Sequence, residues 1–297
     1  MASGWSEVDV TILPALGIVS CLGGPLRSCG YAAEMLRDEF TKQQQEQHRL
    51  QLQWHMLHPE NYATKEERLS RLNQSISRFS QYWTEQNQAF LVIGGDHSCA
   101  MGTWGGVLNG LHQPGKFGLI WLDAHMDAHT FATSPSGNIH GMPLAALLGG
   151  ADKKLAAMYP GCNFIKPENL ILIGVRNYES EEYDLLRQAA VEIVFAEQID
   201  RLADALIKAI DKLSRSCAVI GISIDLDFID PADAPGVETP AQGGIKAGAL
   251  LEALSSINRH PLIGGLEISE FNPENDANNK TLQLMKAMIE AFYGEPL

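Results

Sequence analysis

From residue 89 onward, short apolar runs alternate with longer segments in which apolar residues recur every three or four positions. The apolar runs cover residues 89–94, 117–122, 170–175, 191–195, 218–226 and 262–268, and the segments of helical period cover 180–190, 198–214, 246–258 and 279–293. Continuously apolar runs are typical of parallel strands buried on both faces, with helices as the connections between them. The alternation therefore predicts an α/β fold around a parallel sheet.

The chain has 297 residues and a mass of 32.5 kDa, which one α/β core accommodates. Its 45% hydrophobic and 20% charged residues exclude a disordered or coiled-coil chain. No internal repeat, linker or change of composition marks a boundary. We therefore expect one domain over residues 1–297.

The first 88 residues carry weaker signals. The glutamine-rich stretch 41–58 (TKQQQEQHRLQLQWHMLH) predicts a solvated helix, and residues 65–88 predict an amphipathic helix that leads into the first strand.

Charge and cysteine content exclude several classes of partner. Twenty-two basic against 36 acidic residues give a net charge of −14, which disfavours nucleic acid and anionic membrane surfaces. No run approaches the ~20 apolar residues of a membrane span, and the N-terminus (MASGWSEVDV) is acidic where a secretory signal is basic. The five scattered cysteines predict neither a disulfide framework nor a zinc ribbon. We expect a cytoplasmic protein.

Acidic and histidine side chains cluster directly after three of the predicted strands. The clusters are GGDHS at 94–98, DAHMDAH at 123–129 and SIDLD at 223–227. Ligands of open α/β sheets bind at the carboxyl ends of the strands. In extended chain, residues two apart share a face, so Asp123, His125 and Asp127 should converge, as should Asp225 and Asp227.

Taken singly, each cluster has a structural explanation: the Gly-Gly-Asp-His turn resembles a helix N-cap, and the Asp-x-Asp pair could be an acidic loop. A Ser-His-Asp relay is disfavoured because Asp96, His97 and Ser98 are consecutive. Together, four aspartates and two histidines at one sheet edge require cations to offset their charge. Oxygen and imidazole ligands without thiolate favour manganese first, then nickel, iron or zinc, and six ligands suit two ions.

These residues lie in five motifs that resemble the arginase and agmatinase family, the ureohydrolases. The motifs are GGDHS (94–98), DAHMD (123–127), SGNIHGMPLAALLG (136–149), SIDLDFIDPADAPGVETP (223–240) and EFNP (270–273). The resemblance implies a metal-dependent hydrolase of linear amidines on a three-layer αβα sandwich with a parallel sheet of about eight strands. It implies two Mn²⁺ ions per subunit, with nickel, iron or cobalt as substitutes, and a homo-oligomer, a trimer or hexamer. Residues 1–88 form a divergent N-terminal part of the same domain.

The resemblance also assigns roles to residues. One ion would be held by His97, Asp123, Asp127 and Asp225, and the other by Asp123, His125, Asp225 and Asp227. A hydroxide bridging the ions would attack the guanidinium carbon, and Asp127 would hydrogen-bond that hydroxide. His140 resembles the family's proton shuttle. Glu270 would bind the substrate guanidinium, with Thr239 nearby.

The SGNIHG segment resembles arginases in particular, where Ser136 and Asn138 would bind the α-carboxylate of L-arginine. His129 stands where arginases commonly carry asparagine, and Glu179 stands where they present an aspartate to the α-ammonium, with Glu182 able to help through water. The favoured reaction is hydrolysis of L-arginine to L-ornithine and urea.

The alternatives are another ureohydrolase (agmatinase, guanidinobutyrase, guanidinopropionase or formimidoylglutamase) and a non-catalytic metal- or arginine-binding relative. A zinc deacetylase is disfavoured because it uses one ion and fewer carboxylates.

Overall fold

Eight parallel strands form one sheet in the computed structural model, which describes residues 11–25, 28–44 and 50–294. The strands are β1 (Thr11–Ile18), β2 (Leu50–Leu57), β3 (Phe90–Ile93), β4 (Phe117–Leu122), β5 (Leu170–Val175), β6 (Glu192–Phe195), β7 (Val219–Asp225) and β8 (Ile263–Ser269). Their order across the sheet is β2-β1-β3-β8-β7-β4-β5-β6, with every pair parallel. The predicted α/β class and the strand number are confirmed.

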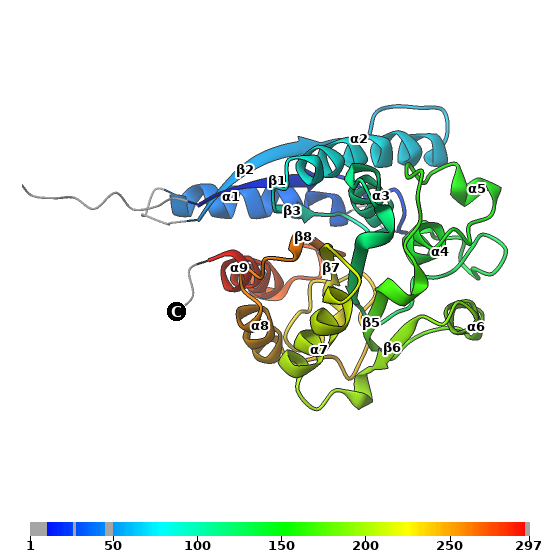
Figure 1. Ribbon diagram of the computed structural model, residues 1–297. Helices are drawn as coiled ribbons and strands as arrows, with labels where there is room; N and C mark the ends of the chain where they lie inside the picture. Colours follow the sequence, from blue (N-terminus) through cyan, green and yellow to red (C-terminus); the bar gives the residue numbers. More distant parts are fainter. Residues whose placement is uncertain (1–10, 26–27, 45–49, 295–297) are drawn as a thin grey trace, which may run out of the picture.

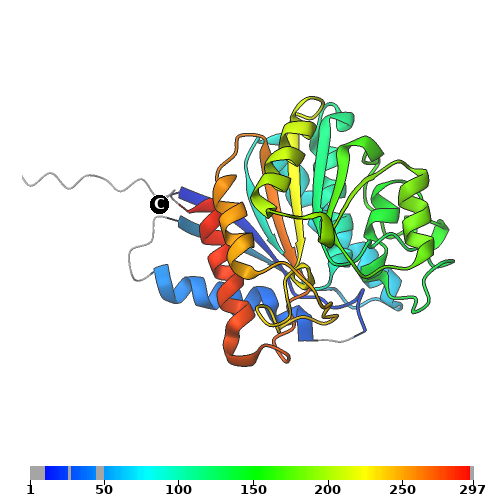
Figure 2. The same ribbon diagram turned by 90° about the horizontal axis from the view of Figure 1, so that it is seen from below.

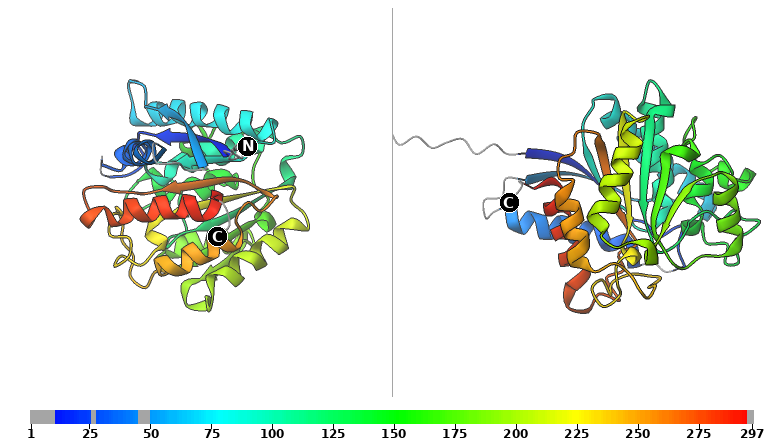
Figure 3. Two further views of the ribbon diagram at one scale, coloured as in Figure 1. Left: turned by 90° about the vertical axis from the view of Figure 1, so that its left-hand side faces the viewer. Right: turned by 60° about the horizontal axis from the view of Figure 1, so that its bottom comes forward.

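Helices cover both faces of this sheet (Figure 1). They are α1 (Ala32–Gln44), α2 (Lys65–Glu85), α3 (Ala100–Gly110), α4 (Pro143–Leu147), α5 (Lys153–Ala156), α6 (Ser180–Gln188), α7 (Leu202–Ser214), α8 (Ala247–Ser256) and α9 (Lys280–Tyr293). Apolar residues of α1, α7, α8 and α9 pack in the core of one face, and those of α2, α3, α4 and α6 in the core of the other. Figure 2 shows α7, α8 and α9 laid over one face, and Figure 3 shows the strands between the two layers. The arrangement is the predicted αβα sandwich.

The sequence of β4 shows why its strand is buried on both sides. Ile120 and Leu122 contribute to the core beneath α7, α8 and α9, whereas Leu119 and Trp121 contribute to the core beneath α2 and α3. Successive side chains of a strand point to opposite faces, so a strand between two helical layers is apolar throughout.

The N-terminal third corrects one expectation and confirms another. The helix predicted over residues 41–58 is present only at residues 41–44, the end of α1, and is wrong at residues 50–57, which form β2. The predicted amphipathic helix over 65–88 is confirmed as α2. In β2, Leu50 and Leu52 are buried and Gln51 and Gln53 are exposed. This alternation with period two is the pattern of a strand with one covered face, and the glutamine content concealed it. Residues 45–49 of the stretch lie outside the described residues.

One disulfide links Cys21 and Cys29, whose Cα atoms lie 5.7 Å apart, and Cys99, Cys162 and Cys217 are free. The bond contrasts with the expectation from scattered cysteines. The chain leaves β1 and turns back before α1, so two cysteines eight residues apart meet, and their spacing in sequence did not reveal this. None of the described helices is both long and apolar enough to cross a membrane.

The fold places the carboxyl ends of β3, β8, β7 and β4 side by side at the centre of the sheet. Ile93 pairs with Ile268, Ile268 with Ile224, and Ile224 with Leu122. The residues that follow these four strands therefore lie side by side at one edge of the sheet.

Close packing between β7 and α3 supplies a test of this arrangement. A Cβ added at Gly221 would lie 2.3 Å from the ring of the buried Trp104. We expect Gly221→Ala to lower the free energy of unfolding by about 1–3 kcal/mol, because neither the strand nor the ring has room to move. Urea denaturation measures the change. Gly248→Ala in α8 is the control, since its added methyl meets no atom, and we expect no loss of stability there; equal losses in both variants would contradict the packing.

Candidate metal centre

The turn after β3 carries His97 into the row of strand ends. A Cβ at Gly95 would lie 1.7 Å from the carbonyl oxygen of Ser20, so only glycine permits this approach of two backbones. Asp96 caps the short turn His97–Cys99 by accepting from the Ser98 backbone N–H at 3.1 Å and also accepts from the Gly23 N–H at 2.9 Å. Asp96 thus has a structural role, and the next side chain, His97, points to the neighbouring strand ends.

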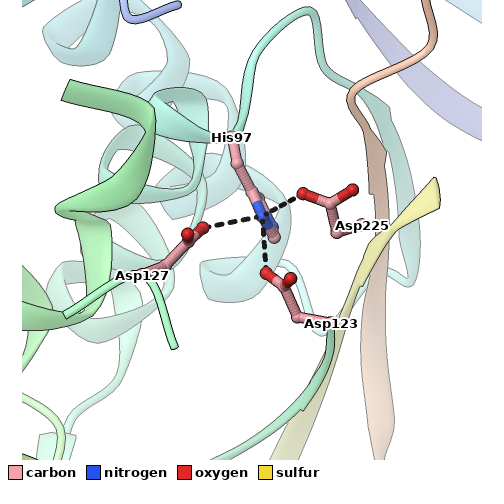
Figure 4. A group of neighbouring side chains, drawn as sticks. All are labelled: His97, Asp123, Asp127 and Asp225. Atoms are coloured by element: carbon pink, nitrogen blue, oxygen red, sulfur yellow. Dashed lines mark ion pairs between the residues drawn. The ribbon is translucent and has the colours of Figure 1, made fainter. Parts of the chain in front are cut away.

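Three carboxylates surround the imidazole of His97 (Figure 4). Its Nδ1 lies 3.4 Å from Asp123 Oδ2, 3.1 Å from Asp127 Oδ2 and 3.2 Å from Asp225 Oδ2. All four side chains are buried, and their ligand atoms lie within 4.8 Å of one another. They come from the ends of β3, β4 and β7, as the convergence of the three sequence clusters predicts.

A second group adjoins the first and shares Asp123 with it. His125 Nδ1 lies 3.5 Å from Asp123 Oδ1 and 2.9 Å from Asp227 Oδ2. The second group consists of Asp123, His125 and Asp227, so Asp225 lies with the first group alone, whereas the resemblance implies that it serves both ions. Two adjacent groups that share a carboxylate suit two neighbouring cations.

Burial and mutual repulsion disturb the protonation of these acids. Burial and the nearby carboxylates raise the pKa of Asp225 and of Asp227, and burial beside Asp123 raises the pKa of Asp127 to about 7. Burial acts on Asp123 in the same sense, but hydrogen bonds with His125 and His97 hold its pKa below the usual range.

Burial acts on the pKa of the two histidines in the opposite sense, but the carboxylates around them outweigh it. Burial alone would lower the pKa of His97, but its three carboxylate neighbours raise the pKa well above its usual range. The carboxylates of Asp227 and Asp123 likewise outweigh burial and raise the pKa of His125. The groups therefore retain protons that a bound cation would displace.

The donor set fits divalent cations. His97 Nδ1 and Asp127 Oδ2 are buried and lack a hydrogen-bond partner, although they face each other across 3.1 Å. Buried polar atoms without partners are rare, and a cation between them satisfies both. Carboxylate oxygen and imidazole nitrogen together are ligands for manganese, iron, nickel or zinc.

Neighbouring polar groups orient these ligands, and their role was not predicted from the sequence. Trp121 Nε1 donates to Asp123 Oδ2 at 2.9 Å, Ser223 Oγ lies 3.0 Å from His97 Nε2, and the Asn177 side-chain nitrogen lies 3.2 Å from His125 Nε2. Trp121 and Ser223 each stand two residues before a metal-ligand candidate on the same face of a strand, which is a usable signal. Asn177 comes from the loop after β5, where the sequence offers none.

Glu270 and His140 lie beside the first group. Glu270 Oε1 accepts from the His97 backbone N–H at 2.6 Å and lies 3.1 Å from His140 Nδ1. Glu270 Oε2 is buried without a hydrogen-bond partner, so one oxygen remains available to a ligand. Although burial opposes both shifts, the pair lowers the pKa of Glu270 and raises the pKa of His140 to about 10.

The backbone holds two of these acids in an uncommon conformation. Asp127 has φ 48° and Glu270 has φ 68°, in the left-handed region that residues with a side chain rarely occupy. Such backbone is retained where the surrounding structure enforces it, and it occurs preferentially at functional sites.

The other predicted substrate residues divide into a cluster and two exposed loops. His129 Nε2 lies 3.2 Å from Glu179 Oε2 and 3.4 Å from Glu182 Oε2. Burial raises the pKa of Glu182 to about 8, whereas hydrogen bonds with Glu182 and His129 outweigh burial at Glu179 and lower its pKa. These three residues form a second acid–histidine cluster whose ligand atoms also lie within 4.8 Å.

Ser136 and Asn138 lie on a turn before His140, in which Ser136 Oγ accepts from the Asn138 backbone N–H at 3.2 Å. Thr239 is exposed, and within the described part of the chain it makes no hydrogen bond. The bridge between Val237 and Phe271 holds its loop beside the Glu270 segment, and no hydrogen bond joins Thr239 to Glu270.

The retained protons yield a test of the metal centre. We expect binding of a divalent cation at pH 7 to release more than one proton per subunit, because both histidines and part of Asp127 are protonated in the metal-free protein. The release should fall, and the apparent affinity should rise, as the pH is raised through these pKa values. Calorimetric titration with Mn²⁺ in buffers of different ionisation enthalpy measures the protons; a binding heat that does not depend on the buffer would contradict the assignment.

Comparison with known proteins agrees with this geometry. Residues 21–294 match the family model of the Arginase family. An arginase of Bacillus caldovelox is 40% identical over 209 residues, which are 70% of this chain and 69% of that protein, and an arginase of Bacillus subtilis is 37% identical over 227 residues, 76% and 75% of the two chains. The crystal structure of arginase from Bacillus subtilis superposes with a TM-score of 0.87 at 30% identity and covers 97% of this chain and 100% of that one. The chain belongs to the arginase family, whose members are metal-dependent hydrolases of guanidino compounds.

Proposed function

We propose that this protein is an arginase that hydrolyses L-arginine to L-ornithine and urea with two Mn²⁺ ions. The observation that carries the proposal is the buried, unpartnered Glu270 Oε2, which lies beside two cation-binding groups and an imidazole. The relatives named as arginases support the choice of substrate class.

The residues of the two groups would hold the ions: His97, Asp123, Asp127 and Asp225 on one side, and Asp123, His125 and Asp227 on the other. When bound, such a pair of cations makes a water molecule a nucleophile at neutral pH. Manganese is proposed from the oxygen-rich ligand set.

Glu270 orients the guanidinium. Its Oε1 is fixed by the His97 N–H and His140, so Oε2 presents a negative charge at a defined position. The lowered pKa keeps the carboxyl ionised at neutral pH, as recognition of a guanidinium requires. The guanidinium carbon is thereby held beside the carboxylates of the first group.

Asp127 and His140 move the protons. The Asp127 carboxylate would accept a proton from the attacking water and pass it to the departing nitrogen as the C–N bond breaks. His140 is protonated at neutral pH and so supplies a proton to the departing amine, which leaves as the ammonium of ornithine. As the urea carbonyl forms, the hydroxyl hydrogen that the carbon gained from water passes to the imidazole of His140. The ring thereby regains the proton it gave, and the steps balance in atoms and charge.

The cluster of His129, Glu179 and Glu182 and the turn with Ser136 and Asn138 would hold the amino-acid end of the substrate. The Glu179 carboxylate, whose pKa is lowered, would offer negative charge to an α-ammonium, and the turn would offer hydroxyl and amide donors to an α-carboxylate. Glu182, whose pKa is raised to about 8, would position Glu179 by accepting from its backbone N–H at 3.2 Å. Agmatine lacks the carboxylate, so the turn favours L-arginine over it. A homo-oligomer, trimer or hexamer, and a cytoplasmic location stay predictions of the sequence.

Urea release from a panel of guanidino compounds tests the proposed substrate. With Mn²⁺ bound, we expect urea from L-arginine and at least about 100-fold lower kcat/KM for agmatine, 4-guanidinobutyrate and 3-guanidinopropionate, because each of these compounds lacks either the α-ammonium or the α-carboxylate and leaves the polar groups proposed for it without a partner. The double variant Ser136→Ala/Asn138→Ala should raise KM for L-arginine and leave any agmatine activity unchanged. Urea from another compound with L-arginine inert would reassign the protein to a different ureohydrolase.

Substitution of the orienting carboxylate tests the mechanism. Glu270→Gln keeps the shape but removes the charge, and we expect kcat/KM for L-arginine to fall about 10²–10³-fold, since a buried charge pair contributes about 3–4 kcal/mol. Glu274→Gln, which changes an exposed glutamate of the same loop, is the matched control and should retain wild-type activity. Equal activity of both variants would refute the role of Glu270.

A further inference from the structure

A carboxylate outside the two cation-binding groups lies behind His97. Glu267 is on β8, its side chain is fully buried, and within the described part of the chain no lysine or arginine forms an ion pair with it. An ionised carboxyl in such a place is costly unless several donors satisfy it.

Three side chains donate to Glu267. Ser223 Oγ donates to Oε2 at 2.7 Å, Thr103 Oγ1 donates to Oε1 at 2.7 Å, and Cys99 Sγ approaches Oε1 at 3.4 Å. A carboxylate only accepts hydrogen bonds, so each hydroxyl must direct its single hydrogen to Glu267. The Ser223 hydroxyl therefore donates its hydrogen to Glu267 and to no other acceptor.

Because Ser223 donates to Glu267, its position determines which nitrogen of His97 carries a hydrogen. Ser223 Oγ lies 3.0 Å from His97 Nε2, and with its own hydrogen on Glu267 it can only accept there. His97 Nε2 must then carry an N–H. When a cation displaces the other ring proton, the lone pair is left on Nδ1, the atom that faces Asp123, Asp127 and Asp225.

We propose that Glu267 is a positioning residue which, through Ser223, holds the hydrogen of His97 on Nε2 and so presents the Nδ1 lone pair to a cation. The proposal rests on the metal role of His97 in the proposed function. It makes Glu267, Ser223 and His97 a relay across β8, β7 and the turn after β3.

The ring plane of His97 is fixed separately. The imidazole stacks on Trp121 with ring centroids 4.1 Å apart and an interplanar angle of 14°. Stacking prevents tilting but allows the ring to turn over, which would exchange Nδ1 with a carbon. The hydrogen bond to Ser223 opposes that turn, so the relay sets orientation as well as tautomer.

The relay serves one of the two cation groups. His125, in the other group, meets an amide at its Nε2, the side chain of Asn177, and no carboxylate lies behind that amide in the described contacts. The proposal therefore predicts an asymmetric effect: loss of Glu267 weakens the ion at His97 and leaves the ion at His125.

Manganese titration of the metal-free protein tests this prediction. We expect wild type to bind two Mn²⁺ per subunit by equilibrium dialysis and to show the electron paramagnetic resonance signal of a coupled pair. Glu267→Gln should bind one ion with wild-type affinity and the other about 10–100-fold more weakly, the usual consequence of losing an outer partner of a histidine ligand. At one equivalent it should show the six-line signal of isolated Mn²⁺. Wild-type affinity for both ions in Glu267→Gln would overturn the proposal.

A double-mutant cycle separates positioning from a general structural role. Ser223→Ala breaks the link and should weaken the same ion, and Glu267→Gln should then add little in the Ser223→Ala background, because both act through one hydrogen bond. Thr103→Val is the matched control: it removes a donor to the other carboxylate oxygen, keeps the Ser223 link, and should bind both ions nearly as wild type does. Additive losses, or an equal loss in Thr103→Val, would overturn the relay. Failure of wild type to bind two ions would instead refute the metal centre itself.

Discussion

Eight acidic side chains are buried in the described part of the chain, whereas no lysine or arginine is. They are Asp96, Asp123, Asp127, Glu182, Asp225, Asp227, Glu267 and Glu270, and all of them belong to the site or its supports. Such crowding of like charge in low dielectric is unfavourable unless protons or cations offset it. Histidines, backbone N–H groups and retained protons offset part of it in the metal-free protein. Bound divalent cations would replace these protons, which couples metal affinity to pH and to the stability of the fold.

The sheet order makes the crowding possible. The strands β3, β8, β7 and β4 are neighbours in the sheet although they are distant in sequence. Because their carboxyl ends are paired, the residues at or just after those ends lie side by side: His97, Glu270, Asp225 and Asp123. The apolar strands and two helical layers fix this row rigidly. Local backbone adjustments then turn the side chains toward one another, through the glycine turn after β3 and the positive φ angles of Asp127 and Glu270.

Features that depend on residues close together in the sequence were predicted, whereas features that depend on contacts between distant segments were not. The bounds of strands such as β4 and β5 were predicted to the residue, because a strand buried on both faces consists of consecutive apolar residues. Five of the six metal-ligand candidates were predicted because spacing of two places side chains on one face, and the sixth, His97, because its glycine turn follows a predicted strand. The strand β2 was missed because glutamines on its exposed face resembled a solvated helix. The relay of Glu267 was missed because it depends on the register between β7 and β8, which pairs Ser223 with Glu267 and which sequence alone does not supply.

The residues proposed for the hydrolytic reaction lie deeper in the fold than most of those proposed to recognise the rest of the substrate. Glu270 and the cation groups, apart from the partly exposed His125, are buried at the ends of paired strands, so their chemistry toward a guanidinium tolerates little change. The residues that would hold the rest of a substrate lie on turns and at a helix start: the Glu179 side chain is 55% exposed, and Ser136 is exposed. A change there alters recognition without disturbing the metal ligands. In the proposed function, substrate choice is set at the rim by Glu179, beside the buried His129, and by the turn before His140, while the proposed relay behind His97 keeps the hydrolytic centre the same whichever guanidino compound binds.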